Sequence, residues 1–395
     1  MMIRIYLMAM LCFMATNAPV QADALSSFSS LKNAGLLVVD TQGQPLRADN
    51  NRRSFIPAST TKIVTAWLAL YRWGEHHRFA TDFHFDPSTY TLTVKGSGDP
   101  FLVSEELLII AKALSQRGVN RVDSLVLDGS AFAQGLILPG TGRTNNPYDA
   151  VPSALAANFN TVNLKRVKRR VRSAEPQTPL TPIARRMYKG IKKKKLRVNL
   201  GRDPQKAERY FGELLFAMLE QQGVVVGDRI SQGIAPQQQA PFYEHLNTRT
   251  LGDMIRPMMK YSTNFIANQL VLMMAQQQFQ RPANARDVQT YMQDNLAAHF
   301  NWTDFTFQEG AGLSRNNRIS PKQLVELLQR FMEYRHLLPE VETGVFAKSG
   351  TLNKVSTLAG YIVDGDEWKP FALMMNQAVP YKLRNRIAKA LRRTL

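Results

Sequence analysis

The sequence predicts an α/β (α+β) fold in which a strand-rich module is inserted into a domain of strands and helices. Residues 35–50 read as a strand, a turn and a second strand, and residues 358–375 hold two further strand-like runs. Residues 63–70 are apolar around the whole helical circumference, which is typical of a helix buried in a core. Between residues 81 and 247 the sequence pattern changes to short strand-like runs around separate helical segments.

The N-terminal segment 1–22 has the features of a secretory signal peptide. Arg4 precedes an apolar run from Ile5 to Met14, and small residues lead to a cleavage site after Ala22. A membrane anchor is the alternative, but this apolar run is short for a bilayer span. We therefore expect an exported, periplasmic protein.

The single cysteine of the chain, Cys12, lies inside this predicted signal peptide. The mature chain is therefore expected to have no disulfide, no thiolate catalysis and no cysteine-bound metal, although the exported compartment permits disulfides. The six histidines form no His-x-x-x-His pair. No metal ion and no other cofactor is expected.

The charge of the chain is strongly positive, with 50 Lys and Arg against 31 Asp and Glu and a net charge of +19. Such a surplus indicates an acidic partner. Fourteen of the basic residues lie between Lys165 and Arg197, against the single acid Glu175. Export argues against nucleic acid, so we expect strands whose basic faces dock to an anionic polymer or surface of the cell envelope. A solvated edge that resists aggregation is the alternative.

The candidate nucleophile is Ser59, which stands just before the buried helix predicted at residues 63–70. Lys62 follows it by three residues, so the two side chains lie on one helical face about one turn apart. A dry site beside other cations disfavours the charged lysine, and a neutral amine can accept the serine proton. The pattern alone is weak, because a capping serine followed by a surface lysine is common.

Two further motifs follow along the chain. Tyr261-Ser-Thr-Asn264 lies between two apolar helical segments, and we expect a tight turn that presents Ser262 and Asn264. Lys348-Ser-Gly-Thr351 precedes two predicted strands, and the small Gly350 would let a substrate strand approach the sheet edge. Each motif alone has an ordinary alternative, a capped turn or a charged edge strand. In this order and in one chain, the three motifs are specific.

With these motifs the sequence resembles the serine active-site penicillin-recognising enzymes, which carry Ser-x-x-Lys, Ser-x-Asn and Lys-Thr/Ser-Gly. Flanking segments such as 94–102, 127–132 and 309–318 are similar to those of the D-Ala-D-Ala carboxypeptidase/endopeptidases, the class C low-molecular-mass penicillin-binding proteins. The resemblance implies a β-lactamase/transpeptidase-like antiparallel sheet sandwiched by helices. It places the catalytic domain in residues 23–80 and 248–395 and the inserted module in 81–247.

The resemblance also implies how peptidoglycan stem peptides are cleaved. Ser59 attacks the carbonyl of the penultimate D-alanine and becomes acylated, while Lys62 takes its proton. Ser262 and Asn264 relay the proton to the leaving amine and hold the peptide amide. Water then releases the acyl group, and β-lactams act as inhibitors that acylate the same serine.

The remaining assignments concern the substrate's ends. Lys348 and the hydroxyls of Ser349 and Thr351 are implied to bind the terminal carboxylate, next to Gly350, and the backbone N–H groups of Ser59 and Thr351 to form the oxyanion hole. In this family an aspartate of the inserted module contacts the amine of the substrate's diamino acid. Asp128 is the best match, and a turn cap is its alternative role.

Two rival functions remain open at the sequence level. A β-lactamase shares the nucleophile and the fold, but the long insertion and the 309–318 segment argue against it. A non-catalytic envelope-binding relative would be expected to have lost Ser59, Lys62 or Lys348, and all three are present. The sequence leaves open whether the enzyme is a carboxypeptidase, an endopeptidase or both, because the scissile bonds are chemically alike.

Overall fold

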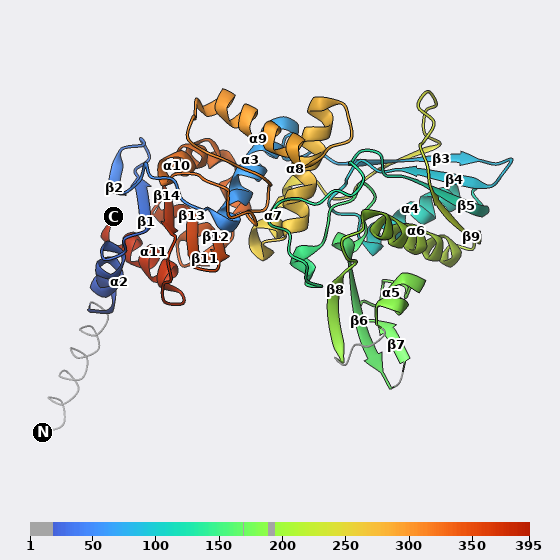
Figure 1. Ribbon diagram of the computed structural model, residues 1–395, viewed down its shortest axis with the longest axis horizontal. Coiled ribbons are helices and arrows are strands. Elements are labelled where there is room, and N and C mark those ends of the chain that lie inside the picture. Colours follow the sequence, from blue (N-terminus) through green and yellow to red (C-terminus); the bar gives the residue numbers. More distant parts are fainter. Residues whose placement is uncertain (1–18, 169, 189–193) are drawn as a thin grey trace, which may run out of the picture. The chain divides into compact units, whose positions relative to one another are not determined.

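The computed structural model describes residues 19–168, 170–188 and 194–395 (Figure 1). They form two compact units. The first unit holds the chain up to Val64 together with Phe300–Thr306 and Arg315–Leu395. The second unit holds Thr65–His299 and Phe307–Ser314. The domain boundaries drawn from the sequence stay a prediction, and most of the predicted signal peptide, with Cys12, lies outside the described residues.

The first unit is built on a six-stranded sheet, in the order β11-β12-β13-β14-β1-β2, whose neighbours are all antiparallel. The predicted strand-turn-strand at residues 35–50 and the two later strands are confirmed. The strands are β1 (Ala34–Val39), β2 (Pro45–Asp49), β11 (Glu340–Glu342), β12 (Val345–Leu352), β13 (Val355–Asp364) and β14 (Glu367–Met375).

Helices cover both faces of this sheet (Figure 1). On one face, Leu358 of the sheet shares a core with Phe28 and Ile387 of two packed helices. On the other face, the buried Tyr361 hydroxyl donates a 2.7 Å hydrogen bond to the Leu328 carbonyl. The predicted sandwich is therefore confirmed. The helices of this unit are α2 (Pro19–Ser29), the short η1 (Ala58–Thr60), the start of α3 (Thr61–Trp73), α10 (Pro321–Arg330), η4 (Met332–Leu337) and α11 (Leu383–Thr394).

The second unit contains a five-stranded mixed sheet in the order β10-β3-β4-β5-β9, in which β4, β5 and β9 run parallel. Parallel neighbours need a crossover, and one helix follows β4 and another precedes β9. Apolar residues of both helices share one core with the sheet. The elements are β3 (Ala80–Asp86), β4 (Thr91–Lys95), α4 (Ser104–Gln116), β5 (Arg121–Asp128), α6 (Pro204–Gln221), β9 (Val225–Gln232) and β10 (Tyr243–Leu246).

A second, three-stranded sheet, β7-β6-β8, lies between β5 and α6 in sequence, where strands with basic faces are predicted. Helices make up most of the rest of this unit. The elements are η2 (Pro147–Asp149), η3 (Asn158–Asn160), β6 (Thr161–Val167), β7 (Arg170–Ser173), α5 (Pro182–Met187), β8 (Lys195–Asn199), α7 (Leu251–Tyr261), α8 (Asn264–Phe279) and α9 (Ala285–Phe300).

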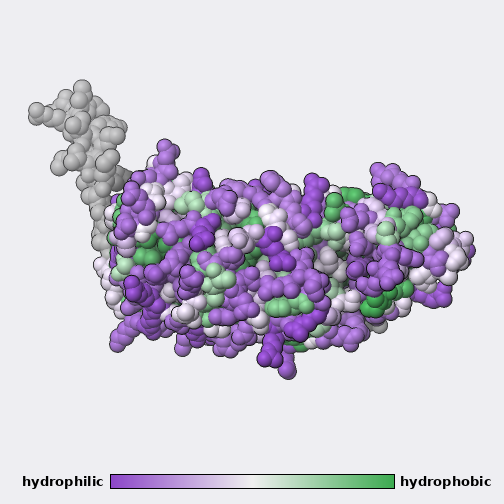
Figure 2. All heavy atoms as spheres, turned by 90° about the horizontal axis from the view of Figure 1, so that it is seen from above, coloured by the Kyte–Doolittle hydropathy of each residue, from purple (hydrophilic) through white to green (hydrophobic). Residues whose placement is uncertain are grey.

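The surface is mainly polar on the face that Figure 2 shows, and apolar side chains form scattered patches there. Among the described residues, no helix is both long enough and apolar enough to cross a membrane.

Candidate active site

The candidate nucleophile lies on a strained turn of the first unit. Ser59 sits in η1, directly before α3, and is partly exposed. The preceding Ala58 is fully buried and has a φ of 49°, in the left-handed region that residues with a Cβ rarely adopt. Such strain persists only where the surrounding structure holds the backbone in place, and it is concentrated at functional sites.

Lys62 lies one helical turn beyond Ser59, as the spacing predicts. Its side chain is completely buried. Its Nζ donates a 3.2 Å hydrogen bond to Ser59 Oγ. Proton transfer between the two groups therefore needs no rearrangement of this part of the chain.

Residues distant in sequence anchor the nucleophile turn. The Pro57 carbonyl accepts hydrogen bonds from Thr60 Oγ1 at 2.8 Å and from Thr357 Oγ1 of β13 at 2.7 Å. The Asn376 side chain accepts from the Ile56 N–H at 2.7 Å and donates to the Ile56 carbonyl at 3.1 Å. These bonds hold the turn against the sheet and over-determine the backbone of Ala58.

Gly350 of the third motif allows β12 to lie directly against this turn. A Cβ at this position would stand 2.8 Å from both the Pro57 carbonyl oxygen and the Ser59 nitrogen, and 2.2 Å from Thr357 Oγ1. Any larger residue must therefore push the strand away from Ser59. The sequence suggested close approach of a substrate strand at Gly350, whereas the structure shows close approach of the nucleophile turn itself.

The other residues of the third motif alternate between the two faces of the sheet. Lys348 pairs with Ala359 and Gly350 with Thr357, on the face that carries the nucleophile turn. Ser349 pairs with Leu358, whose side chain belongs to the core under α11, so the Ser349 and Thr351 side chains lie on the α11 face. The pleat thus separates the lysine from the two hydroxyls with which the sequence grouped it.

Lys348 is a nearly fully buried cation. Its side chain is 2% exposed, and its Nζ donates a 2.6 Å hydrogen bond to the Ser349 carbonyl. Burial, and after it the positive charge of Arg384 on α11, lower the pKa of Lys348 to about 7. The motif lysine can therefore change its charge near neutral pH.

Ser262 and Asn264 belong to the second unit, where they form the predicted turn between two helices. Ser262 ends α7 in the left-handed conformation, with φ 57° and ψ 42°, and Asn264 opens α8. The Asn264 side chain donates a 3.1 Å hydrogen bond to the Tyr148 carbonyl. Both motif residues line a cavity of about 470 Å³.

This cavity is aromatic and basic, which the motif did not indicate. Phe101, Tyr148, Phe159 and Arg197 are among its lining residues. Arg197 lies 5.8 Å over the Phe159 ring and donates a 2.9 Å hydrogen bond to Thr161 Oγ1. Arg197 comes from the basic segment, so a charge that the sequence placed far from the motifs lies beside one of them.

Asp128 has the geometry of the turn cap that the sequence left as its alternative role. Its side chain is fully buried at the end of β5. One carboxylate oxygen accepts the Ser130 N–H at 3.0 Å, and the other accepts the Ala235 N–H at 2.8 Å. Asp128 lines neither the cavity of Ser262 nor the neighbouring pocket described next.

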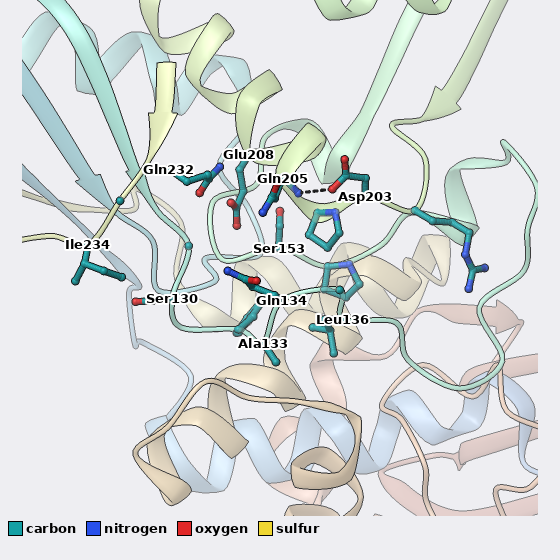
Figure 3. A pocket seen from close by; sticks show the side chains of 17 residues that line it. Ser130, Ala133, Gln134, Leu136, Ser153, Asp203, Gln205, Glu208, Gln232 and Ile234 are labelled. Atoms are coloured by element: carbon teal, nitrogen blue, oxygen red, sulfur yellow. Dashed lines mark hydrogen bonds between the residues drawn. The ribbon is translucent and has the colours of Figure 1, made fainter. Parts of the chain in front are cut away.

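A separate pocket of about 500 Å³ adjoins this turn, and Figure 3 shows its polar side chains. Glu208 of α6 points into it, and the side chains of Gln134, Gln205 and Gln232 lie around it. Burial raises the pKa of Glu208 to about 7. Glu208 and Asp203 are the two acids that line this pocket, and no sequence motif drew attention to either.

Within the first unit, the structure thus brings together Ser59, Lys62 and the strand 348–351. Ser262 and Asn264 share a cavity in the second unit, and Asp128 lies elsewhere in that unit. Sequence reasoning missed Arg384, which contacts the third motif from α11. In the sequence, Arg384 is one of several basic residues of an amphipathic helix, and nothing distinguishes it from the others.

Comparison with solved structures identifies the fold. Penicillin-binding protein 4 (DacB) from Haemophilus influenzae matches with a TM-score of 0.74 at 20% identity, over 94% of this chain and 98% of that chain. A predatory endopeptidase from Bdellovibrio bacteriovorus matches with a TM-score of 0.55 at 14% identity, over 92% of each chain. The fold is therefore that of the penicillin-binding serine peptidases.

Comparison of sequences identifies the family. The model of the D-Ala-D-Ala carboxypeptidase 3 (S13) family matches residues 22–195 and 184–343. The D-alanyl-D-alanine carboxypeptidase DacB of Haemophilus influenzae is 23% identical over 407 residues, which cover 87% of this chain and 85% of the relative. The chain belongs to the S13 family, and it is a serine DD-peptidase of peptidoglycan.

Gly350→Ala tests the close approach of β12 to the nucleophile turn. We expect acylation by a fluorescent penicillin to slow by at least about 100-fold, with stability lowered by about 1–3 kcal/mol from overpacking. Gly212→Ala in α6 is the control, because its new Cβ would meet only side-chain carbons of Ile230 and Leu127, at 3.1 Å and more. Acylation of Gly350→Ala at the wild-type rate would contradict this account.

Lys348→Met tests the buried charge. Between pH 7 and 10 the unfolded lysine binds a proton that the folded one has already released, so this group makes the wild type more stable as the pH rises. The wild type should gain about 2–4 kcal/mol more than the Met variant between these limits. Melting temperatures across that pH range measure the difference. Parallel pH profiles for the two proteins would show that the lysine is not desolvated.

Proposed function

We propose that Ser59 is the nucleophile that cleaves the D-Ala-D-Ala bond through an acyl-enzyme. Ser59 Oγ attacks the carbonyl carbon of the penultimate D-alanine, and its proton passes to the neutral Lys62 amine. The amide nitrogen of the terminal residue then leaves with a proton, and water later hydrolyses the ester. The observation that carries the proposal is the 3.2 Å contact of a wholly buried lysine with the serine on the strained turn.

The oxyanion that forms in this step would be held by the backbone N–H groups of Ser59 and Thr351. The absence of a side chain at Gly350 supports this assignment, because it lets the strand that carries Thr351 lie against the Ser59 nitrogen. A pair of preorganised backbone donors stabilises a developing negative charge without reorganisation, and losing one such donor typically costs about 3–4 kcal/mol of barrier.

Ser262 and Asn264 are proposed to relay the proton to the leaving amine and to hold the peptide amide. Their motif and the cavity that they line support this role. Lys348 is proposed as a catalytic residue that faces the nucleophile turn, while the hydroxyls of Ser349 and Thr351 bind the substrate carboxylate. Asp128 is proposed to stabilise the conformation of its loop, because its carboxylate already accepts hydrogen bonds from two backbone N–H groups.

The same serine should be acylated by β-lactams, and the protein should act in the periplasm after export. The proposed export rests on the N-terminal sequence alone. Carboxypeptidase and endopeptidase activity are both compatible with the proposed chemistry, since each cleaves a bond between a D-alanyl carbonyl and an amine at a D-centre.

Ser59→Ala tests the mechanism. The mature wild-type protein, incubated with penicillin, should show a mass increase on Ser59 that lasts for minutes, whereas Ser59→Ala should show none. The wild type should also release D-alanine, shortened stem peptides or both from intact sacculi, as resolved by mass spectrometry of muropeptides. When the full chain, with residues 1–22, is expressed and exported, the intact mass of the product reports whether it begins after Ala22.

Ser54→Ala is the matched control, because Ser54 lies five residues upstream and should leave both reactions intact. Rapid turnover of penicillin by the wild type would instead indicate a β-lactamase. Trimming of muropeptides by Ser59→Ala would refute the mechanism.

We also propose that the three-stranded sheet docks to anionic groups of the cell envelope, such as peptidoglycan carboxylates. Lys165 of β6 is paired with Arg172 of β7 on one side and with Lys195 of β8 on the other. Directly paired residues of an antiparallel sheet share a face. The register adds Arg170 and Arg197 to the same side, and we call these five residues the basic face.

The opposite side of this sheet is apolar and explains why the charges gather on one face. Val162, Leu164 and Val198 lie in the core of the second unit. Arg197 extends the basic face to the cavity of Ser262 and Asn264, which gives a bound anionic polymer a continuous path to that motif. Arg169, Lys189, Lys192 and Lys193 of the predicted basic segment lie outside the described residues.

Neutralising Lys165, Arg172 and Lys195 to glutamine tests this docking surface. Binding to purified sacculi should fall several-fold at low salt, and the difference should fade as salt screens the charges. Cleavage of a small D-Ala-D-Ala peptide should not change. The control variant K112Q/R229Q/K389Q removes the same number of charges elsewhere. Equal sacculus binding by the two triple variants would end the proposal.

A further inference from the structure

Arg384 of α11 makes two short hydrogen bonds to the third motif. Its Nη1 donates to the Gly350 carbonyl at 2.7 Å and to Thr351 Oγ1 at 2.7 Å. Both bonds use the same nitrogen, so Nε and Nη2 of the guanidinium have no hydrogen-bond partner among the residues that the structure describes. A rigid fork with donors to spare is the geometry that binds a carboxylate.

Side chains alternate between the two faces of β12, and this alternation places Arg384 on the same face as the two motif hydroxyls. Ser349 and Thr351 point to the α11 face, and Lys348 points to the other. A carboxylate that accepts hydrogen bonds from the two hydroxyls therefore meets Arg384, and not Lys348, as the cation on its own face. Thr351 Oγ1 accepts from Arg384, so its own proton is directed to another acceptor.

The cavity beside Arg384 is basic and therefore favours the binding of an anion. Arg384, Lys354 and Lys382 line a cavity of about 470 Å³ with Thr351, and none of the lining residues is acidic. Burial lowers the pKa of Arg384, which shows that its charge is partly desolvated. A bound carboxylate would compensate that charge, and an arginine keeps its proton at any physiological pH.

We propose that Arg384 is a substrate-binding residue that recognises the C-terminal carboxylate of the substrate together with the Ser349 and Thr351 hydroxyls. This proposal rests on the proposed function, since it names the carboxylate partner in that reaction. The bond to the Gly350 carbonyl has a second effect. That carbonyl belongs to the same peptide group as the Thr351 N–H, so the arginine polarises the proposed oxyanion donor.

A comparison of two substrates tests the role of Arg384. One is a peptide ending in D-Ala-D-Ala with a free carboxylate, and the other is the same peptide with a C-terminal amide. In Arg384→Gln, kcat/KM for the free acid should fall about 10- to 100-fold, the range for loss of a charge-assisted hydrogen bond. The value for the amide should fall by a clearly smaller factor, which reports the lost polarisation of the Thr351 N–H, so the preference for the acid largely disappears.

Arg384→Lys and Arg392→Gln complete the design. The lysine variant keeps the charge without the fork and should recover part of the preference. Arg392 lies on the same helix and donates a 3.1 Å hydrogen bond to the Val363 carbonyl, so its loss also removes a contact between α11 and the sheet but should leave the preference intact. This control separates carboxylate recognition from general loosening of the helix.

One outcome would refute the role of Arg384, and a different outcome would refute the proposed function. An Arg384→Gln enzyme that still prefers the free acid to the wild-type extent overturns the role of Arg384, even if its overall rate falls. Cleavage that survives Ser59→Ala rejects the proposed function, whatever the preference between acid and amide. Measured melting temperatures ensure that each rate refers to folded protein.

Discussion

The contact between β12 and the nucleophile turn is the constraint on which the rest of the site depends. The strand passes so close to Ser59 that no Cβ fits at Gly350, and the turn is held there by Thr357 and Asn376. This contact brings the strand that carries Thr351 directly against the Ser59 nitrogen, and these two residues supply the donors of the proposed oxyanion hole. The strained Ala58 is tolerated because the sheet, and not the local sequence, determines the path of the turn.

The two cations beside the third motif, Lys348 and Arg384, lie on opposite faces of β12. Lys348 faces the nucleophile turn, whereas the hydroxyls of Ser349 and Thr351 face Arg384. One four-residue motif thus serves both sides of the sheet. In the proposed mechanism the lysine serves the reacting groups at Ser59, while Arg384 of α11 binds the substrate carboxylate. This division gives a physical reason for a motif in which polar residues alternate around a glycine.

The sequence predicted what depends on local spacing and missed what depends on register. Ser59 and Lys62 could be placed on one helical face, and Ser262 in a turn, because a few neighbouring residues decide these features. Arg384 could not be predicted, since a basic residue on an amphipathic helix does not reveal which strand end it meets. Asp128 was ambiguous for the same reason, because one of the N–H groups it accepts belongs to the distant Ala235. The basic segment was found from composition, but the folded structure was needed to show that Arg197 lines the cavity of Ser262 and Asn264.

The order of the strands has a consequence for the timing of activity during synthesis. β1, near the start of the chain, lies between β2 and β14, and the turn at Ser59 is tied to Thr357 and Asn376, about three hundred residues later. An incomplete polypeptide can contain the serine and the lysine, yet it lacks the strands that shape their turn. Contacts of such high sequence separation form late in folding. The nascent enzyme is therefore expected to stay inert until its last strands have joined the sheet.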